Sequence, residues 1–128
     1  MSLSHPPVPQ ALSNGLCALA CLALLAPPAA AQEPQEITTR HDFTALVDGA
    51  RLTALGVTLR IRSDGRIRGE MLGTDVSGRW HWRDSMFCHR LGWGDRGKTE
   101  SCQSVTLISR ILRFTGPEGE IRDFWLRR

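Results

Sequence analysis

The chain has 128 residues, of which 16 are Lys or Arg and 13 are Asp or Glu, and its formal net charge is +3. This length holds one domain at most and excludes a dinucleotide-binding domain joined to a substrate domain. The cations are fifteen Arg and one Lys, Lys98, a bias that reflects either GC-rich codon usage or bidentate binding of carboxylate and phosphate groups.

The first 31 residues contain no Lys, Arg, Asp or Glu. An apolar run, Gly15–Ala26, is followed by Pro27-Pro28 and Ala29-Ala30-Ala31. This order predicts a signal peptide over 1–31, cleaved between Ala31 and Gln32, and hence a periplasmic or secreted protein. The segment before the run has only His5 and the α-amine as positive charges, which is atypical. The run is nevertheless too short and too interrupted by proline to suit a membrane span, so we expect none in the mature chain.

Processing leaves a mature chain of 97 residues, Gln32–Arg128. We expect 32–38 to be a mobile leader, because it is polar and contains proline, and 39–128 to be a single domain. Cys17 and Cys21 leave with the signal peptide. Cys88 and Cys102 remain, and in an exported protein two cysteines most simply form one disulfide.

The domain begins with a predicted helix from about Arg40 to Asp48, for which Thr39 is a suitable N-cap and Gly49 a suitable end. Its apolar residues recur at helical spacing: Phe43, Leu46, Val47 and Ala50. A weak strand over Arg51–Leu55 follows.

From Val57 the pattern changes to period two, which predicts half-buried strands. A three-residue loop with Gly65 in the left-handed conformation pairs Ile61 with Ile67 and keeps both faces consistent, whereas a two-residue loop mixes apolar and charged residues. The next connection, Leu72–Asp75, is predicted as a four-residue loop. The pairs that it creates are Met71 with Val76, Gly69 with Gly78, and Ile67 with Trp80.

Further strands are predicted at Met86–Leu91, Cys102–Leu107, Leu112–Phe114 and Ile121–Leu126, with a loop over Gly92–Thr99. The fold class is therefore all-β, with a small α+β fold as the alternative. We expect an antiparallel meander or small up-and-down β-barrel of seven to eight short strands, with one short N-terminal helix and one disulfide. Trp80 and Trp82 belong to its core. A two-residue turn at Asp84-Ser85 puts Cys88 outside with His81, whereas a three-residue turn puts it inside with Trp82.

Several motifs resemble a group of small exported alphaproteobacterial proteins, mostly uncharacterised, some of which carry the label dihydrodipicolinate reductase. The motifs are Gly78-x-Trp80-x-Trp82-x-Asp84, Phe87-Cys88, Cys102-Gln103-x-Val105 and Leu112-Arg113-Phe114, within about Leu52–Leu126. Ser85 stands where the group usually has Gly, and His89 intervenes before Arg90, where the group usually has Arg directly after the cysteine. The resemblance implies export, the disulfide and a small β fold, but no catalytic residue. The reductase label has no support in the residues, because no G-x-G-x-x-G lies on a strand-to-helix turn.

Other motifs indicate no specific chemistry. Gly92–Thr99 matches the phosphate-loop string G-x-x-x-x-G-K-T, but a strand pattern follows it where the motif needs a helix. His81, Cys88, His89 and His41 lack the spacing of a metal site, and no serine has an identifiable base. We therefore predict no metal, no cofactor and no catalytic residue, and we favour a binding protein over an enzyme.

The outer face of the three strands from Val57 to Arg83 is the candidate binding surface. In the predicted registers, one row is Arg60, Arg68 and Arg79, and the next is Arg62, Arg66 and His81, with Arg83 beyond. Facing like charges destabilise a sheet by about 0.2–1 kcal/mol per pair. This face is either a solvated arginine-rich surface or the site of an anionic partner.

We predict a non-catalytic module that binds an anionic envelope component, such as lipopolysaccharide phosphates, an acidic protein or a small polyanion, and no nucleic acid. One alternative is a lipocalin-like barrel that holds a small apolar ligand near Trp80 and Trp82. The other is a reductase, as the label of some related proteins states.

Overall fold

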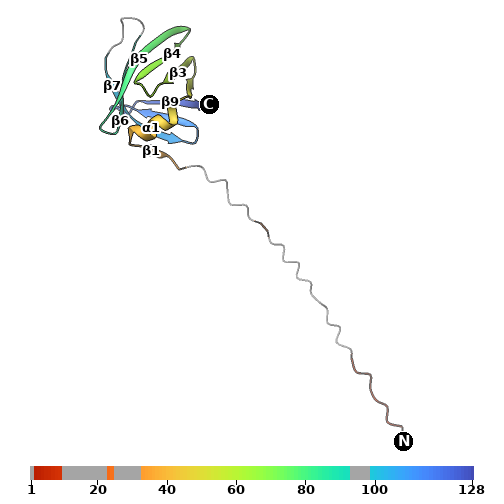
Figure 1. Cartoon of the computed structure of the whole chain (residues 1–128). Coiled ribbons are helices and arrows are strands. Elements are labelled where there is room, and N and C mark those ends of the chain that lie inside the picture. The colour runs from red at the N-terminus through yellow and green to blue at the C-terminus, as the bar shows by residue number, and fades with distance from the viewer. Residues whose placement is uncertain (1, 10–22, 25–32, 93–98) are drawn as a thin grey trace.

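The computed structural model describes residues 2–9, 23–24, 33–92 and 99–128 (Figure 1). Most of the predicted signal peptide and its cleavage point lie outside the described residues, and so do residues 93–98 of the phosphate-loop string. In the part of the chain that is described, no helix is long and apolar enough to cross a membrane.

The described residues fold into a closed antiparallel β-barrel with one helix (Figure 1). The elements are β1 (Gln35–Ile37), α1 (Arg40–Val47), β2 (Arg51–Ala54), β3 (Val57–Ile61), β4 (Arg66–Met71), β5 (Thr74–Arg83), β6 (Met86–Gly92), β7 (Ser101–Ile108), β8 (Ile111–Thr115) and β9 (Ile121–Arg127). Strands β2 to β9 pair in chain order, and β9 pairs with β2 to close the barrel. The predicted all-β class, the small up-and-down barrel and the N-terminal helix are confirmed.

Strand β1 corrects the prediction of a mobile leader over 32–38. It pairs with β7, with Ile37 opposite Val105, and the side chain of Ile37 is buried. Strand β6 pairs with β7 only at Ser101–Gln103, on the same edge of β7 that β1 occupies. Without β1, the rest of that edge would have no backbone hydrogen-bond partners. A strand that buries one side chain is too short to show a period-two pattern, which is why the sequence reads as a leader.

Helix α1 lies across one end of the barrel, which we call the base (Figure 1). The predicted N-cap is confirmed, because the Thr39 hydroxyl oxygen accepts a hydrogen bond of 3.1 Å from the Asp42 amide. Gly49 follows the helix at φ 73°, as a helix end requires. The buried side chains of Phe43 and Val47 join the barrel core, and the Arg128 guanidinium donates to the Ala45 carbonyl at 3.2 Å.

The β3–β4 register is confirmed, with Ile61 opposite Ile67 and Gly65 at φ 89° in the loop. The predicted β4–β5 register is wrong by two residues. Gly69 lies opposite Val76, and Ile67 lies opposite Gly78. The reason is a two-residue turn at Leu72-Gly73, both in the left-handed conformation, in place of the predicted four-residue loop. A shift of two residues preserves the faces but changes every row across the sheet.

The two tryptophans lie inside, as predicted. Trp80 is buried and its indole N–H donates to the Arg62 carbonyl at 2.7 Å. Trp82 is half-buried and donates to the Thr38 carbonyl at 3.1 Å, which ties the base of the barrel to the segment before α1. Cys88 and Cys102 are directly opposite each other and form the predicted disulfide.

Candidate functional site

A cavity of about 530 Å³ occupies the barrel interior at the end opposite α1. We call this cavity the cup, and its open end the mouth. The inward-facing side chains that line it are Leu52, Ala54, Val57, Leu59, Ile61, Ile67, Met71, Phe87, His89, Leu91, Gln103, Phe114, Arg122 and Phe124. Most of them are aliphatic or aromatic, so the cup is an apolar container closed at the base by Phe43 and its neighbours.

Three inward-facing polar side chains interrupt the apolar lining, His89, Gln103 and Arg122, and Asp123 borders the cup from an outward-facing position of β9. His89 lies opposite Trp80 in the β5–β6 ladder and therefore points inward, and its ring stacks on Phe87 with centroids 5.0 Å apart. Its Nδ1 is buried without a hydrogen-bond partner among the described residues. Burial lowers the pKa of His89, and a hydrogen bond with the Ser101 backbone opposes this effect in part. His89 is therefore a neutral imidazole in the wall of the cup at neutral pH.

Exposed apolar side chains lie at the mouth in the part of the rim that the structure describes. Leu55 and Leu72 occupy the β2–β3 and β4–β5 turns and are 101% and 85% exposed, and Ile121 at the start of β9 is 53% exposed. Leu55 and Ile121 also line the cup. The apolar surface of the cavity therefore continues outward onto the rim.

On the outer face of the barrel, four arginines form a row that begins at the residue after β3 and crosses β4, β5 and β6, and we call this the arginine row. Arg66 lies opposite Arg79, which lies opposite Arg90. Arg62 stands beside Arg66, because the Arg62 amide donates to the Arg66 carbonyl at 2.9 Å. Arg60 and Arg68 are opposite each other in the adjacent row, whose next member is Ser77.

Only part of the arginine row is neutralised. Asp64 lies 3.4 Å from Arg62 and 4.0 Å from Arg66, and a hydrogen bond from the Arg66 amide, assisted by both guanidinium charges, holds the pKa of Asp64 below its usual value. Among the described residues, Arg79 and Arg90 have no ion-pair partner. A shallow depression of about 340 Å³ between them has Ser77, Gly78 and Gly92 in its floor. Gly78 is required there, since a Cβ would clash with the Arg90 carbonyl oxygen.

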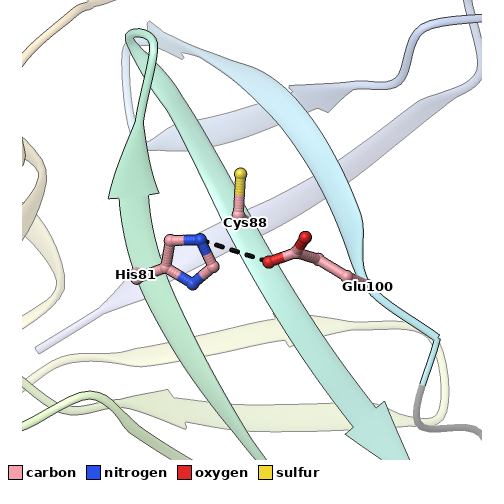
Figure 2. Close-up of side chains that lie close together, drawn as sticks. All are labelled: His81, Cys88 and Glu100. Carbon is pink, nitrogen blue, oxygen red and sulfur yellow. Dashed lines mark ion pairs between the residues drawn. The ribbon is translucent and has the colours of Figure 1, made fainter.

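His81 and Arg83, predicted to extend the basic face, belong to a separate cluster around Glu100. His81 Nε2 lies 3.1 Å from one carboxylate oxygen of Glu100, and Arg83 Nη2 lies 3.4 Å from the other. Figure 2 shows the side chain of Cys88 beside those of His81 and Glu100. Its sulfur lies within 4.8 Å of their ligand atoms. Because that sulfur is bonded to Cys102, only the imidazole and the carboxylate could hold a metal in this oxidised form.

The structure shows on which side of the sheet Cys88 lies, which the sequence left open because the length of the turn at Asp84-Ser85 was not determined. Arg83 lies opposite Met86, so Asp84-Ser85 is a two-residue turn with φ values of 52° and 57°. Cys88 is therefore on the outer side, opposite His81, yet its side chain is fully buried. It lies beneath the Glu100 cluster, and Arg83 Nη2 is 3.5 Å from the Cys102 sulfur. The disulfide is outside the barrel core, with Cys88 shielded from water and Cys102 partly exposed.

No protein family model, no curated protein and no solved structure matches this chain. The functional assignment of the protein thus depends on the cup and the arginine row themselves.

Sequence reasoning missed three residues of these sites. Arg90 joins the arginine row, and the two-residue turn at Asp84-Ser85, if chosen, would have predicted it. His89 and Arg122 face inward, opposite Trp80 and Phe114 respectively. A period-two pattern conceals such residues, because it assigns polar side chains to the outer face by default.

Proposed function

We propose that this protein is an exported, non-catalytic binding protein that holds a small apolar or amphipathic molecule in the cup. The observation that carries the proposal is the apolar cavity of about 530 Å³ that opens at one end of the closed barrel. Small-molecule sites are concave, mostly apolar, of roughly 300–1,000 Å³, and contain a few polar groups. Eight-stranded barrels have interiors that either fill with side chains or accommodate one small ligand.

Uptake of the probe N-phenyl-1-naphthylamine tests this function. We expect saturable fluorescence enhancement with the native protein. Val57→Trp, which adds an indole to an inward-facing position near the mouth, should weaken binding at least tenfold because the ring occupies the cup. Thr58→Trp adds the same ring to the next, outward-facing position of β3 and should bind the probe as the native protein does. Absence of saturable uptake, or equal binding by both variants, would rule out the cup as the ligand site.

Export is the second part of the proposal. It is supported by the signal-peptide pattern over 1–31 and by the disulfide between Cys88 and Cys102, which persists in oxidising compartments. Expression of the full chain in a Gram-negative host, followed by fractionation and intact mass measurement, should give periplasmic protein that begins at Gln32. Full-length protein retained in the cytoplasm would contradict export.

The arginine row supports a second candidate function, binding of an anionic partner on the outer face. The specific observation is that Arg79 and Arg90 face each other without an ion-pair partner among the described residues, over a depression floored by small residues. Such like-charge pairs destabilise a sheet unless an anion lies between them. We include lipopolysaccharide phosphates, an acidic protein surface and small polyanions in this candidate.

Affinity for purified lipopolysaccharide and for pyrophosphate tests the second candidate. The double variant R79Q/R90Q should weaken binding about tenfold or more, because it removes two charge-assisted contacts. The variant R51Q/R110Q removes the same charge from positions outside the arginine row and should change affinity about twofold at most at physiological salt. If the two variants lose affinity equally, the affinity depends only on the net charge of the protein, and a defined binding site is contradicted.

A further inference from the structure

Among the described residues, one arginine faces the inside of a mostly apolar barrel. Arg122 lies opposite Phe114 in the β8–β9 ladder, and paired residues of a ladder share a face, so Arg122 shares the inner face with the buried ring of Phe114. It belongs to the lining of the cup and remains solvent-exposed, since it stands near the start of β9, at the mouth. An inward-facing guanidinium at this position has no role in packing the core, which is completed below it by Leu112 and Phe124.

The acidic residues nearest in the chain are engaged elsewhere. Asp123 borders the cup next to Arg122, but both of its carboxylate oxygens accept hydrogen bonds from Arg113, of 2.8 and 2.9 Å, on the outer side of β9. Glu120 is two positions before Arg122 and therefore on the same side of the chain. Its carboxylate, however, accepts a hydrogen bond of 3.1 Å from the Glu118 amide within the β8–β9 turn. Among the described residues, no carboxylate lies within ion-pair distance of Arg122.

The surroundings of Arg122 define what could bind it. Beneath it the cup is lined by aliphatic and aromatic side chains, and beside it the rim residue Ile121 is apolar. A guanidinium presents a planar fork of donors that matches a carboxylate or a phosphate bidentately. A ligand with an apolar body and one anionic end would bury the body in the cup and bring the anionic end to Arg122.

We propose that the ligand of the cup is an anionic amphiphile, an apolar chain or ring system with a single carboxylate or phosphate head, and that Arg122 binds this head at the mouth. This inference depends on the proposed ligand-binding function of the cup. His89 and Gln103 lie in the wall formed by β6 and β7, and they are the other inward-facing polar groups of the lining that could hydrogen-bond a ligand.

Displacement of N-phenyl-1-naphthylamine from the native protein by a matched series tests the inference: dodecanoic acid, dodecyl phosphate and dodecanol, each below its critical micelle concentration. The three compounds share a chain and differ in the head. We expect at least one of the two anions to bind about tenfold or more tightly than the alcohol, the range that one charge-assisted contact supplies. Comparison of dodecanoic acid with dodecyl phosphate shows whether the cup prefers a carboxylate or a phosphate head.

The variant Arg122→Gln should reduce the preference for the anion to about twofold or less, because it removes the charge that holds the head, and saturable uptake of the probe by the variant shows that the barrel is folded. Arg122→Lys should retain part of the preference, because charge remains but the bidentate fork is lost. Arg110→Gln removes a charge from the β7–β8 turn at the opposite end of the barrel and should keep the full preference.

The outcomes separate the two proposals. If the native protein binds neither the probe nor any of the three amphiphiles, the ligand-binding function fails and this inference fails with it. If anion and alcohol bind equally well, or if the preference for the anion survives in Arg122→Gln, the cup remains a ligand site and the role of Arg122 is overturned.

Discussion

The ring of Phe43 meets the indole of Trp80 edge to face, with the ring centroids 5.3 Å apart. Phe43 comes from α1 and Trp80 from the inner face of β5, so this contact attaches the helix to the barrel wall. Phe43 also contacts Trp82, Phe87 and Phe114, with centroids between 5.0 and 6.4 Å away. One side chain thus closes the base of the cup against four aromatic rings from three strands.

Phe43→Ala should lower the free energy of unfolding by about 3–5 kcal/mol, because it leaves a cavity among four aromatic rings. Urea denaturation followed by tryptophan fluorescence measures the change. His41→Ala, an exposed position in the same helix, should change stability by no more than about 0.5 kcal/mol. A loss below about 1 kcal/mol for Phe43→Ala would show that α1 does not close the base.

Removal of the disulfide should also destabilise the barrel. Cys88 and Cys102 are separated by 14 positions in sequence, and closing a loop of this size is worth about 3 kcal/mol in the chain-entropy model. The variant C88A/C102A should lose about this amount in urea denaturation, and alanine suits the fully buried position of Cys88. Native protein treated with a dithiol reductant is the matched comparison, and an unchanged unfolding midpoint after complete reduction would contradict the prediction.

The extent to which the sequence predicts the fold is clearest at the two hairpins of β3, β4 and β5. For β3 and β4, a loop one residue shorter would have placed Ile61 opposite Arg68, so the apolar pattern selected the observed register. For β4 and β5, the predicted and observed registers differ by two residues, and both put Ile67, Gly78 and Trp80 inside. A period-two pattern cannot distinguish them. Leu72, at φ 50°, is also not a residue that signals a two-residue turn.

The same error changed the predicted site. Arg79 moved from the row of Arg60 and Arg68 to the row of Arg66, where Arg90 joins it. His81 and Arg83 bind Glu100, a residue more than fifteen positions away in sequence whose pairing no local pattern predicts. A lipocalin-like ligand site was predicted as an alternative near Trp80 and Trp82, but neither tryptophan lines the cup. Alternation shows which side chains face inward but not how completely they fill the space between them, so the position of the cavity was not predictable.

Leu72→Asn should stabilise the protein. Leu72 has φ 50° and precedes Gly73 at φ 80°, the conformation of a turn in which Asn-Gly is the favoured pair. A left-handed conformation costs a branched L-residue about 1–2 kcal/mol and Asn less, so we expect a gain of about 1 kcal/mol in urea denaturation. Leu55→Asn removes another exposed leucine of the rim, from a position without positive φ, and should leave stability nearly unchanged. If both variants gain the same free energy of unfolding, the cause is the removal of an exposed apolar side chain and not the backbone conformation of Leu72.

Stability should fall on mild acidification because of His89. Burial holds the pKa of its imidazole below the value of about 6.5 expected in the unfolded chain. Its contribution is therefore complete above that value and is lost as the pH falls toward the folded pKa, since the unfolded chain binds a proton that the folded barrel does not. The slope is at most about 1.4 kcal/mol per pH unit. Urea denaturation between pH 7.5 and pH 5 should show the fall in native protein and in His41→Gln, which lacks an exposed imidazole of α1, but a smaller fall in His89→Gln. Parallel curves for native protein and His89→Gln would mean that His89 is protonated as readily in the cup as in the unfolded chain.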